Sequence, residues 1–103
     1  MKKLIPYGRQ SISSKDISAI VKTTKSDYLT TGPKVIEFEK EIRKYTGSRY
    51  AAVCNSGTSA LHLAFLSISI KAGDIVIMPS INFIASFNIC KMLKAKIYLS
   101  DVD

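Results

Sequence analysis

Apolar residues recur at helical spacing near the start of the chain. Three of them in the stretch SSKDISAIVKTTKS fall on one helical face: Ile17, Ile20 and Val21. Ser13 stands three residues before Asp16, a spacing that resembles a capping box, although glutamate or glutamine is the usual partner. The pattern predicts a helix over residues 15–26.

A second helical pattern follows the turn TTGP. Its apolar positions recur at steps of three and four, while charged residues occupy the other face; the apolar set is Val35, Phe38, Ile42 and Tyr45. Pro33 lies near the first position, where its missing N–H costs nothing. Gly47 is placed to end the helix at the position that favours glycine. We therefore expect a second helix between these two residues.

The second half of the chain alternates short apolar runs with helix-like segments. Unbroken apolar runs lie at residues 50–54, 75–78 and 97–99, and such continuity is typical of strands buried on both faces of a parallel sheet. Helical patterns separate them over residues 58–69 and 82–93. The order helix, helix, β, α, β, α, β predicts an α/β fold with a parallel sheet.

A sheet of three parallel strands that stops at a strand end looks unfinished. We therefore expect residues 1–103 to form a single incomplete domain, with an N-terminal arm and helices over residues 1–48 and the start of an α/β domain over residues 49–103. The chain shows no internal repeat, low-complexity segment or linker.

Composition narrows the class of protein. The chain has 103 residues, of which 47% are hydrophobic, as expected for a small globular protein. Its formal net charge of +7 favours anionic partners such as phosphates or nucleic acid. The lysines and arginines are scattered, however, and no aromatic residues interleave a basic cluster. They are most simply solvated surface charges, so we expect no nucleic-acid partner.

The cysteines and the single histidine exclude a metal site as the basis of function. Cys54 and Cys90 lie far apart in apolar runs and have no partner at metal-ligand spacing, so we expect reduced, buried thiols. His62 is expected to pack within its helix. The apolar stretch LIPYG is too short for the core of a signal peptide, and no run reaches membrane-spanning length. We expect a cytoplasmic protein without a membrane partner.

The stretch NSGTS, at residues 55–59, joins an apolar run to a helical pattern. One interpretation is a turn with an N-cap. The other is a phosphate cradle, because a helix N-terminus directs unpaired N–H groups and positive potential at one spot. Gly57 would let an anion approach the backbone, and Thr58 could add a hydroxyl. Neither GxxxxGK[ST] nor GxGxxG is present, so the motif alone decides nothing.

Five stretches in order resemble the start of a known family: PYGRQSI, DYLTTGPKVIEFE, YAAVCNSGTSALHLAFLSI, GDIVIMPSINFIASFNI and SDVD. They are similar to the pyridoxal-phosphate-dependent nucleotide-sugar aminotransferases of the DegT/StrS type, over essentially the whole chain. The resemblance implies the N-terminal part of the large domain of a fold type I PLP-dependent transferase, with parallel βαβ units preceded by two helices.

The resemblance also implies roles for individual residues. Ser56, Gly57 and Thr58 would hold the 5′-phosphate of pyridoxal phosphate, and Phe83 would stack on its pyridine ring. A nucleotide-sugar site would be lined by residues that match the family's substrate positions, namely Tyr7, Asp27, Tyr28, Leu29, Thr30 and Gly57. Asn82 departs from the family, which more often has threonine at this position.

The catalytic lysine of the family has no match in this chain. The chemistry needs a lysine that forms a Schiff base and an acid that keeps the pyridine nitrogen protonated. Both lie downstream in the family, and the lysines late in this chain match no such motif: Lys71, Lys91, Lys94 and Lys96. We expect an inactive fragment, a truncated gene product or one piece of a split enzyme.

The resemblance thus implies amino transfer from an amino acid, commonly glutamate, to a nucleotide-linked keto sugar, by an enzyme that is a homodimer when complete. Two alternatives remain open on the residues alone. One is a small non-catalytic phosphate- or nucleotide-binding α/β module, which the NSGTS turn and the net charge permit. The other is a nucleic-acid-binding domain, for which the expected basic and aromatic cluster is absent from the sequence.

Overall fold

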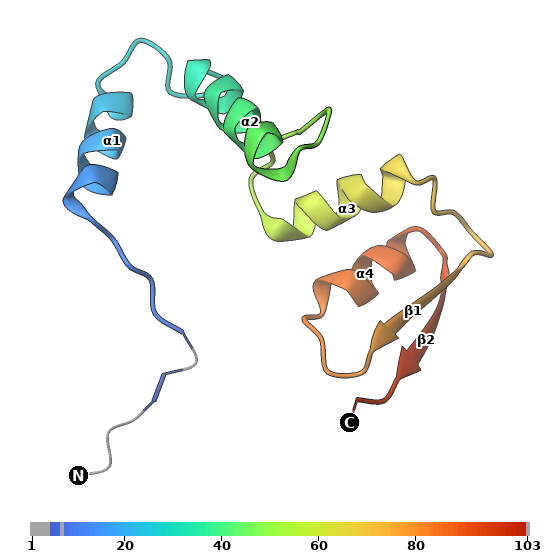
Figure 1. The fold of residues 1–103 in the computed structure, drawn as a ribbon. Helices are drawn as coiled ribbons and strands as arrows, with labels where there is room; N and C mark the ends of the chain where they lie inside the picture. Colours follow the sequence, from blue (N-terminus) through green and yellow to red (C-terminus); the bar gives the residue numbers. More distant parts are fainter. Residues whose placement is uncertain (1–4, 7, 103) are drawn as a thin grey trace. The chain divides into compact units, whose positions relative to one another are not determined.

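The computed structural model describes residues 5–6 and 8–102, and it divides into two compact units that meet between Ala51 and Ala52. The first unit contains helices α1 (Ser14–Thr24) and α2 (Pro33–Thr46) (Figure 1). The second contains α3 (Gly57–Ser67), β1 (Ile75–Pro79), α4 (Ala85–Met92) and β2 (Lys96–Ser100).

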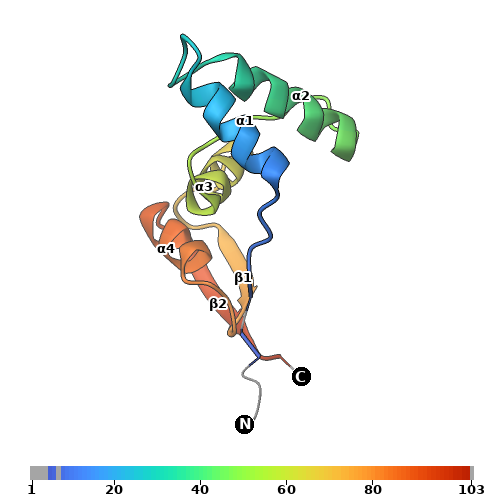
Figure 2. The ribbon, with the colours of Figure 1, turned by 90° about the vertical axis from the view of Figure 1, so that its left-hand side faces the viewer.

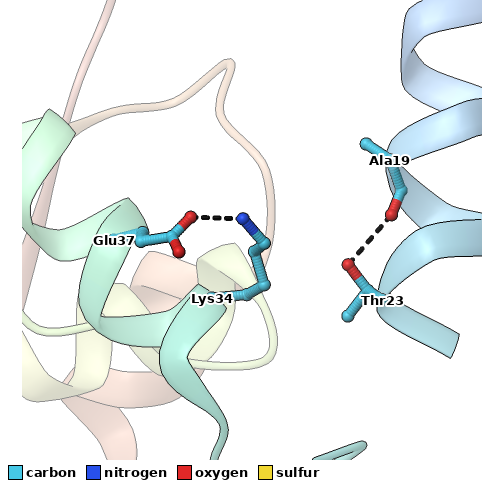
Figure 3. A network of polar contacts seen from close by, with 4 residues as sticks. All are labelled: Ala19, Thr23, Lys34 and Glu37. Atoms are coloured by element: carbon cyan, nitrogen blue, oxygen red, sulfur yellow. Dashed lines mark hydrogen bonds and ion pairs between the residues drawn. The ribbon is translucent and has the colours of Figure 1, made fainter. Parts of the chain in front are cut away.

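Helix α1 begins with the capping box that its sequence predicts. The backbone N–H of Ser13 donates to the Asp16 carboxylate at 2.7 Å, and the Asp16 N–H donates to the Ser13 hydroxyl at 3.3 Å. Near the other end, the Thr23 hydroxyl donates to the Ala19 carbonyl at 2.9 Å (Figure 3). The predicted helix is confirmed, and it ends two residues earlier than residue 26.

Helix α2 lies between Pro33 and the left-handed Gly47, as the sequence predicts. Pro33 occupies the first turn, and an ion pair joins Lys34 to Glu37 on the exposed surface (Figure 3). Gly32 precedes the helix where space is short: a Cβ at this position would lie 2.8 Å from the Cβ of Tyr28. Glycine is therefore required here by close approach rather than by its backbone angles.

The second unit is built on a two-stranded parallel sheet. Strands β1 and β2 pair in register from Ile75 opposite Lys96 to Pro79 opposite Ser100, with α4 as the connection between them. Helix α4 lies along the sheet in both views (Figures 1 and 2). A small core joins β1, α4 and the turn before β2: Met78, Cys90 and Ala95, with Phe65, Ile70, Val76, Phe87 and Ile97 packed against it.

The expectation of a third strand at residues 50–54 is wrong for this structure. The segment runs without regular structure, and Tyr50 is largely exposed. An apolar run favours burial, but a strand also needs a neighbouring backbone to complete its hydrogen bonds. Among residues 5–6 and 8–102, β1 and β2 pair only with each other, and residues 50–54 do not join their sheet.

Burial is concentrated in the second unit. Helices α1, α2 and α3 contain no buried residue, whereas α4 buries Ala85, Ile89 and Cys90. The sequence predicted helices correctly here, because helical spacing and caps act locally. It did not predict which apolar faces are covered, because that depends on neighbouring elements.

The two cysteines differ in exposure, contrary to the expectation that both are buried. Cys90 is 0% exposed, whereas Cys54 is half-buried and its thiol lies 3.4 Å from the Ser56 carbonyl oxygen. In the described part of the chain, no group of three or more histidine, cysteine and acidic residues could hold a metal ion. No described helix has the length and apolar character needed to cross a membrane.

Burial raises the pKa of the Cys90 thiol, so we expect it to react far more slowly than Cys54. In Cys54→Ser, the remaining thiol should react with Ellman's reagent only as the fold opens. An opening free energy of about 1.4 kcal/mol already slows labelling about tenfold. In Cys90→Ser, the remaining thiol should react at once. The denatured variants serve as the control for intrinsic thiol reactivity. Equal labelling rates for the two folded variants would contradict the difference in burial between Cys90 and Cys54.

Hydrogen bonds from the Ser13 backbone and hydroxyl hold the pKa of Asp16 below its ordinary value of 3.8. A lowered folded-state pKa stabilises the helix start above the unfolded pKa, and this contribution disappears as the pH falls through the folded value. We expect the Ser13 amide resonance to titrate below pH 3.8 together with a loss of α1 helicity. In Asp16→Asn the Ser13 amide resonance should not titrate in this pH range. If it titrates in the variant as it does in the unmodified chain, the titration belongs to a group other than Asp16.

Candidate functional site

The turn before α3 is held by a hydrogen-bonded chain of side chains. Ser56 is the N-cap in extended conformation, and its hydroxyl accepts from the Ser59 N–H at 3.1 Å. The hydroxyls of Ser56 and Ser59 lie 3.0 Å apart, and Ser59 donates to the Asn55 side-chain oxygen at 2.8 Å. Ser56 therefore acts as a cap, so the first interpretation of NSGTS is correct as far as this residue goes.

Capping leaves part of the helix N-terminus available. The Ala60 N–H is bonded to the Ser56 carbonyl and the Ser59 N–H to the Ser56 hydroxyl. Within the described residues, Gly57 and Thr58 have no such acceptor for their N–H groups, and the Thr58 hydroxyl shows no hydrogen bond. These three donors lie at the positive end of the helix dipole, so the turn can both cap the helix and bind an anion.

Gly57 has no structural requirement within its own unit. Its φ is not in the left-handed region, and a Cβ at this position would meet no atom within 4 Å. A larger side chain would instead project into open space beside the free N–H groups. Glycine at this place is thus consistent with close approach of a ligand to the backbone, and the residues present fit a phosphate.

A pocket of about 640 Å³ brings the turn together with the segment that follows β1. Its walls come from α3 and from the start of α4, and they are Gly57, Thr58, Ala60, Leu61, Ala64, Phe83 and Ala85. Phe83 is 74% exposed, so its ring is available to a ligand. The structure thereby places three of the sequence-predicted cofactor residues at one cavity: Gly57, Thr58 and Phe83.

Phe83 also lines a second pocket of about 230 Å³, beyond the carboxyl ends of the two strands. Ser80 and Asn82 provide its polar groups, and Leu99 forms part of its apolar wall. The Ser80 N–H donates to the Ser100 carbonyl at 2.8 Å, which fixes the start of the loop that carries Phe83. The carboxyl edge of a parallel sheet is where α/β folds usually bind ligands.

Four pocket residues were not predicted as site residues from the sequence: Ala85 at the start of α4 and three residues of α3. Ala60, Leu61 and Ala64 follow Gly57 at steps of three, four and seven, so they share its helical face. That spacing was the available signal. His62 is half-buried on α3 and does not line the pocket, as expected for a packing residue.

No lysine lines the pocket of about 640 Å³ that Phe83 shares with Gly57 and Thr58. Lys91 and Lys96 line a different hollow, of about 500 Å³, beside Phe87 and Tyr98. The pocket therefore offers backbone donors, one hydroxyl and an aromatic ring, which can bind and orient a ligand, but no amine nucleophile.

Apart from Gly57 in the second unit and Tyr7, the predicted substrate residues lie in the first unit. Residues 27–30 form the turn between α1 and α2, in which Tyr28 and Leu29 are exposed. The Ser26 hydroxyl donates to the Tyr28 carbonyl at 3.2 Å, and the Gly32 N–H donates to the Thr30 carbonyl at 2.9 Å. Tyr7 lies outside the described residues. The sugar-binding role of these residues stays a prediction.

Two curated relatives cover nearly all of the chain. The UDP-4-amino-4-deoxy-L-arabinose–oxoglutarate aminotransferase of Shewanella sediminis is 38% identical over 101 residues, which are 98% of this chain and 26% of the relative. The UDP-4-amino-4,6-dideoxy-N-acetyl-beta-L-altrosamine transaminase of Campylobacter jejuni is 40% identical over 99 residues, 96% of this chain and 26% of the relative.

Solved structures agree with these relatives. Spr1654 from Streptococcus pneumoniae in its PLP form superposes with a TM-score of 0.85 at 31% identity, covering 96% of this chain and 25% of that one. The aminotransferase from Psychrobacter cryohalolentis gives a TM-score of 0.81 at 32% identity, covering 95% and 26%. These matches confirm the predicted α/β fold class. The fold is that of one part of the large domain of PLP-dependent aminotransferases.

The chain spans about a quarter of the length of the relatives that it matches. The sequence profile that fits it is described as the DegT/DnrJ/EryC1/StrS aminotransferase family, and the fit extends from residue 10 to residue 103. With nine tenths of its residues inside that match, the chain belongs to the DegT/DnrJ/EryC1/StrS aminotransferase family.

Proposed function

We propose that this chain supplies the cofactor-phosphate cradle of a PLP-dependent aminotransferase that acts on a nucleotide-linked sugar. The observation that carries the proposal is the shared pocket of Gly57, Thr58 and Phe83. Family membership and the PLP form of a structural neighbour supply the identity of the ligand.

The phosphate would be held by the start of α3. The free N–H groups of Gly57 and Thr58 and the Thr58 hydroxyl would donate to its oxygens, with support from the helix dipole. The hydrogen bonds that link Asn55, Ser56 and Ser59 would keep these donors oriented, because they connect the turn to the first turn of the helix. Ser56 would contribute through capping rather than through direct contact.

The exposed ring of Phe83 would pack against the pyridine ring and fix its plane. When bound, the cofactor supplies an electron sink for amino transfer. This chain would provide binding and orientation, while the lysine and the acid that the chemistry needs match none of its residues at the pocket. We therefore propose that the 103-residue chain alone does not catalyse amino transfer.

The substrate of the complete enzyme is proposed from the relatives. The names of two of them specify UDP-linked amino sugars, and one specifies oxoglutarate. We propose a nucleotide-linked 4-keto sugar as amino acceptor and glutamate as donor, in the synthesis of surface-polysaccharide or flagellin-glycan sugars such as pseudaminic acid. Tyr7, Asp27 and residues 28–30 would line the sugar-nucleotide site of a cytoplasmic homodimer.

We expect Thr58→Val to weaken binding of pyridoxine 5′-phosphate, a probe that lacks the aldehyde and so forms no Schiff base with surface lysines. A hydrogen bond to a charged group is worth roughly 1.5–3 kcal/mol, which corresponds to a loss of about ten- to a hundredfold. Gly57→Val should cost at least as much, because its side chain would fill the space beside the free N–H groups. Calorimetric titration measures both.

His62→Leu is the matched control for these variants, because it lies on the same helix but outside the pocket. Its affinity should equal that of the unmodified chain, and pyridoxine without phosphate should bind none of the chains well. If Thr58→Val and Gly57→Val bind as well as the unmodified chain, NSGTS is only a helix cap.

We expect no specific covalent attachment of the cofactor to this chain. Incubation with pyridoxal phosphate, borohydride reduction and peptide mapping should give scattered, substoichiometric labelling of surface lysines. A single stoichiometric pyridoxyl-lysine, at Lys91 or Lys96 for example, would disprove the proposed division of roles. Pyridoxine 5′-phosphate serves as the competitor for the pocket. Lysine labelling that this competitor does not reduce would support the proposed division of roles.

A further inference from the structure

A hollow of about 500 Å³ is lined by residues of helix α4 and strand β2. Helix α4 contributes Phe87 and Lys91 to the lining. The rest of the lining comes from the start of β2 and the residue before it: Ala95, Lys96, Ile97 and Tyr98. Apart from Phe87, none of these residues lines the two pockets that contain Phe83, so the hollow is a different site.

The backbone of β2 leaves one edge of the strand without a partner at this hollow. The Lys96 N–H donates to the Asp74 carbonyl at 2.8 Å, so the backbone of Lys96 is directed toward β1. Backbone groups alternate in direction along a strand, and those of Ile97 and Leu99 are therefore directed to the outer edge. Among the described residues, β2 pairs only with β1.

The lining of the hollow comes from both faces of the sheet. Ile97 packs against the core on the face that α4 contacts. Successive side chains of a strand point to opposite faces, so Lys96 and Tyr98 lie on the other face. Lys91 of α4 and Lys96 of β2 are thus on opposite sides of the free edge. A strand added beside β2 would alternate its own side chains between the same two faces.

The charge at the hollow is positive. The stretch from residue 75 to residue 100 has no acidic residue, whereas it contains Lys91, Lys94 and Lys96. In the described part of the chain, none of these three lysines forms an ion pair. Asp74, which precedes β1, accepts a hydrogen bond from the Lys71 N–H at 2.9 Å. Unpaired cations of this kind favour an acidic partner.

Each lining lysine also has a local role. Lys91 lies in the last turn of α4, where a cation interacts favourably with the helix dipole. Lys96 lies on an edge strand, where lysine opposes pairing with further strands. That opposition is selective, because an ammonium group repels a basic strand and attracts an acidic one. A second copy of this chain, which has a net charge of +7, is therefore a poor partner for the edge.

We propose that the outer edge of β2 binds an extended acidic segment of another polypeptide by strand addition. The backbone of the segment would pair with the outward backbone groups of β2. Two adjacent acidic side chains, which point to opposite faces, would contact Lys91 and Lys96. Apolar side chains beyond them would pack near Phe87 and Tyr98. The proposal does not depend on what the phosphate cradle binds.

The test uses a short fluorescein-labelled peptide with two adjacent glutamates followed by alternating valines and threonines. Its binding to the unmodified chain is measured by fluorescence anisotropy without cofactor. Lys91→Glu and Lys96→Glu should each weaken binding at least about tenfold, the effect of roughly 1.4 kcal/mol. Lys91→Arg and Lys96→Arg, which keep the charge, should bind within about threefold of the unmodified chain.

Two controls separate specific binding from general attraction to a basic protein. Lys94→Glu changes the net charge as much as the other reversals, but Lys94 does not line the hollow. This variant should weaken binding by less than about threefold, because exposed charges away from the ligand are screened by salt. A peptide with glutamines in place of the glutamates should bind at least about tenfold more weakly than the acidic peptide.

Hydrogen exchange distinguishes strand addition from loose electrostatic binding. The Tyr98 amide, which is directed toward β1, should be protected in every folded variant. The Ile97 and Leu99 amides should exchange rapidly in the free chain and become protected when the acidic peptide binds. The proposal is overturned if the acidic peptide does not bind, if it binds without protecting these amides, or if Lys94→Glu is as damaging as Lys96→Glu. Self-association that protects the same amides without peptide would also overturn it.

Discussion

The parallel pairing of β1 with β2 is the constraint on which the rest of the second unit depends. Because parallel strands need a connection that returns to the same end of the sheet, the chain must place a helix between them, and α4 is that helix. Packing of α4 on the sheet buries Cys90 and Met78 in the one cluster of buried apolar residues found among those described. The carboxyl ends of the strands then fix where the loop with Phe83 begins.

The candidate site follows from that arrangement. The loop after β1 carries Phe83, and α3 presents its N-terminus to the same pocket. One side of the pocket is thus an aromatic ring on a loop, and the other is a set of backbone donors on a helix. The local hydrogen bonds of Asn55, Ser56 and Ser59 orient the donors without occupying them. A cap and an anion site can therefore coexist in five residues.

Exposed apolar surface is the other main property of this chain. Apolar faces with clear helical periodicity on α1 and α2 remain largely exposed, as does one face of the sheet. Parallel sheets and amphipathic helices gain their stability from packing, so these faces stabilise the fold little while they are exposed.

The sequence by itself determined the features that rest on local physics. The capping box of Ser13 and Asp16, the limits of α2 and the parallel class of the two strands could be predicted because caps, turn residues and hydrophobic continuity act over a few positions. The family resemblance added the choice of Gly57, Thr58 and Phe83. That the expected parts form one incomplete domain stays a prediction.

Tertiary structure decided what depends on distant partners. It showed that residues 50–54 form no strand, because strand formation depends on a neighbouring backbone that the local sequence does not specify. It separated the half-buried Cys54 from the buried Cys90, although both lie in apolar runs. It also brought Phe83 to the pocket beside Gly57 and Thr58, because only the packing of α3 and α4 sets that proximity.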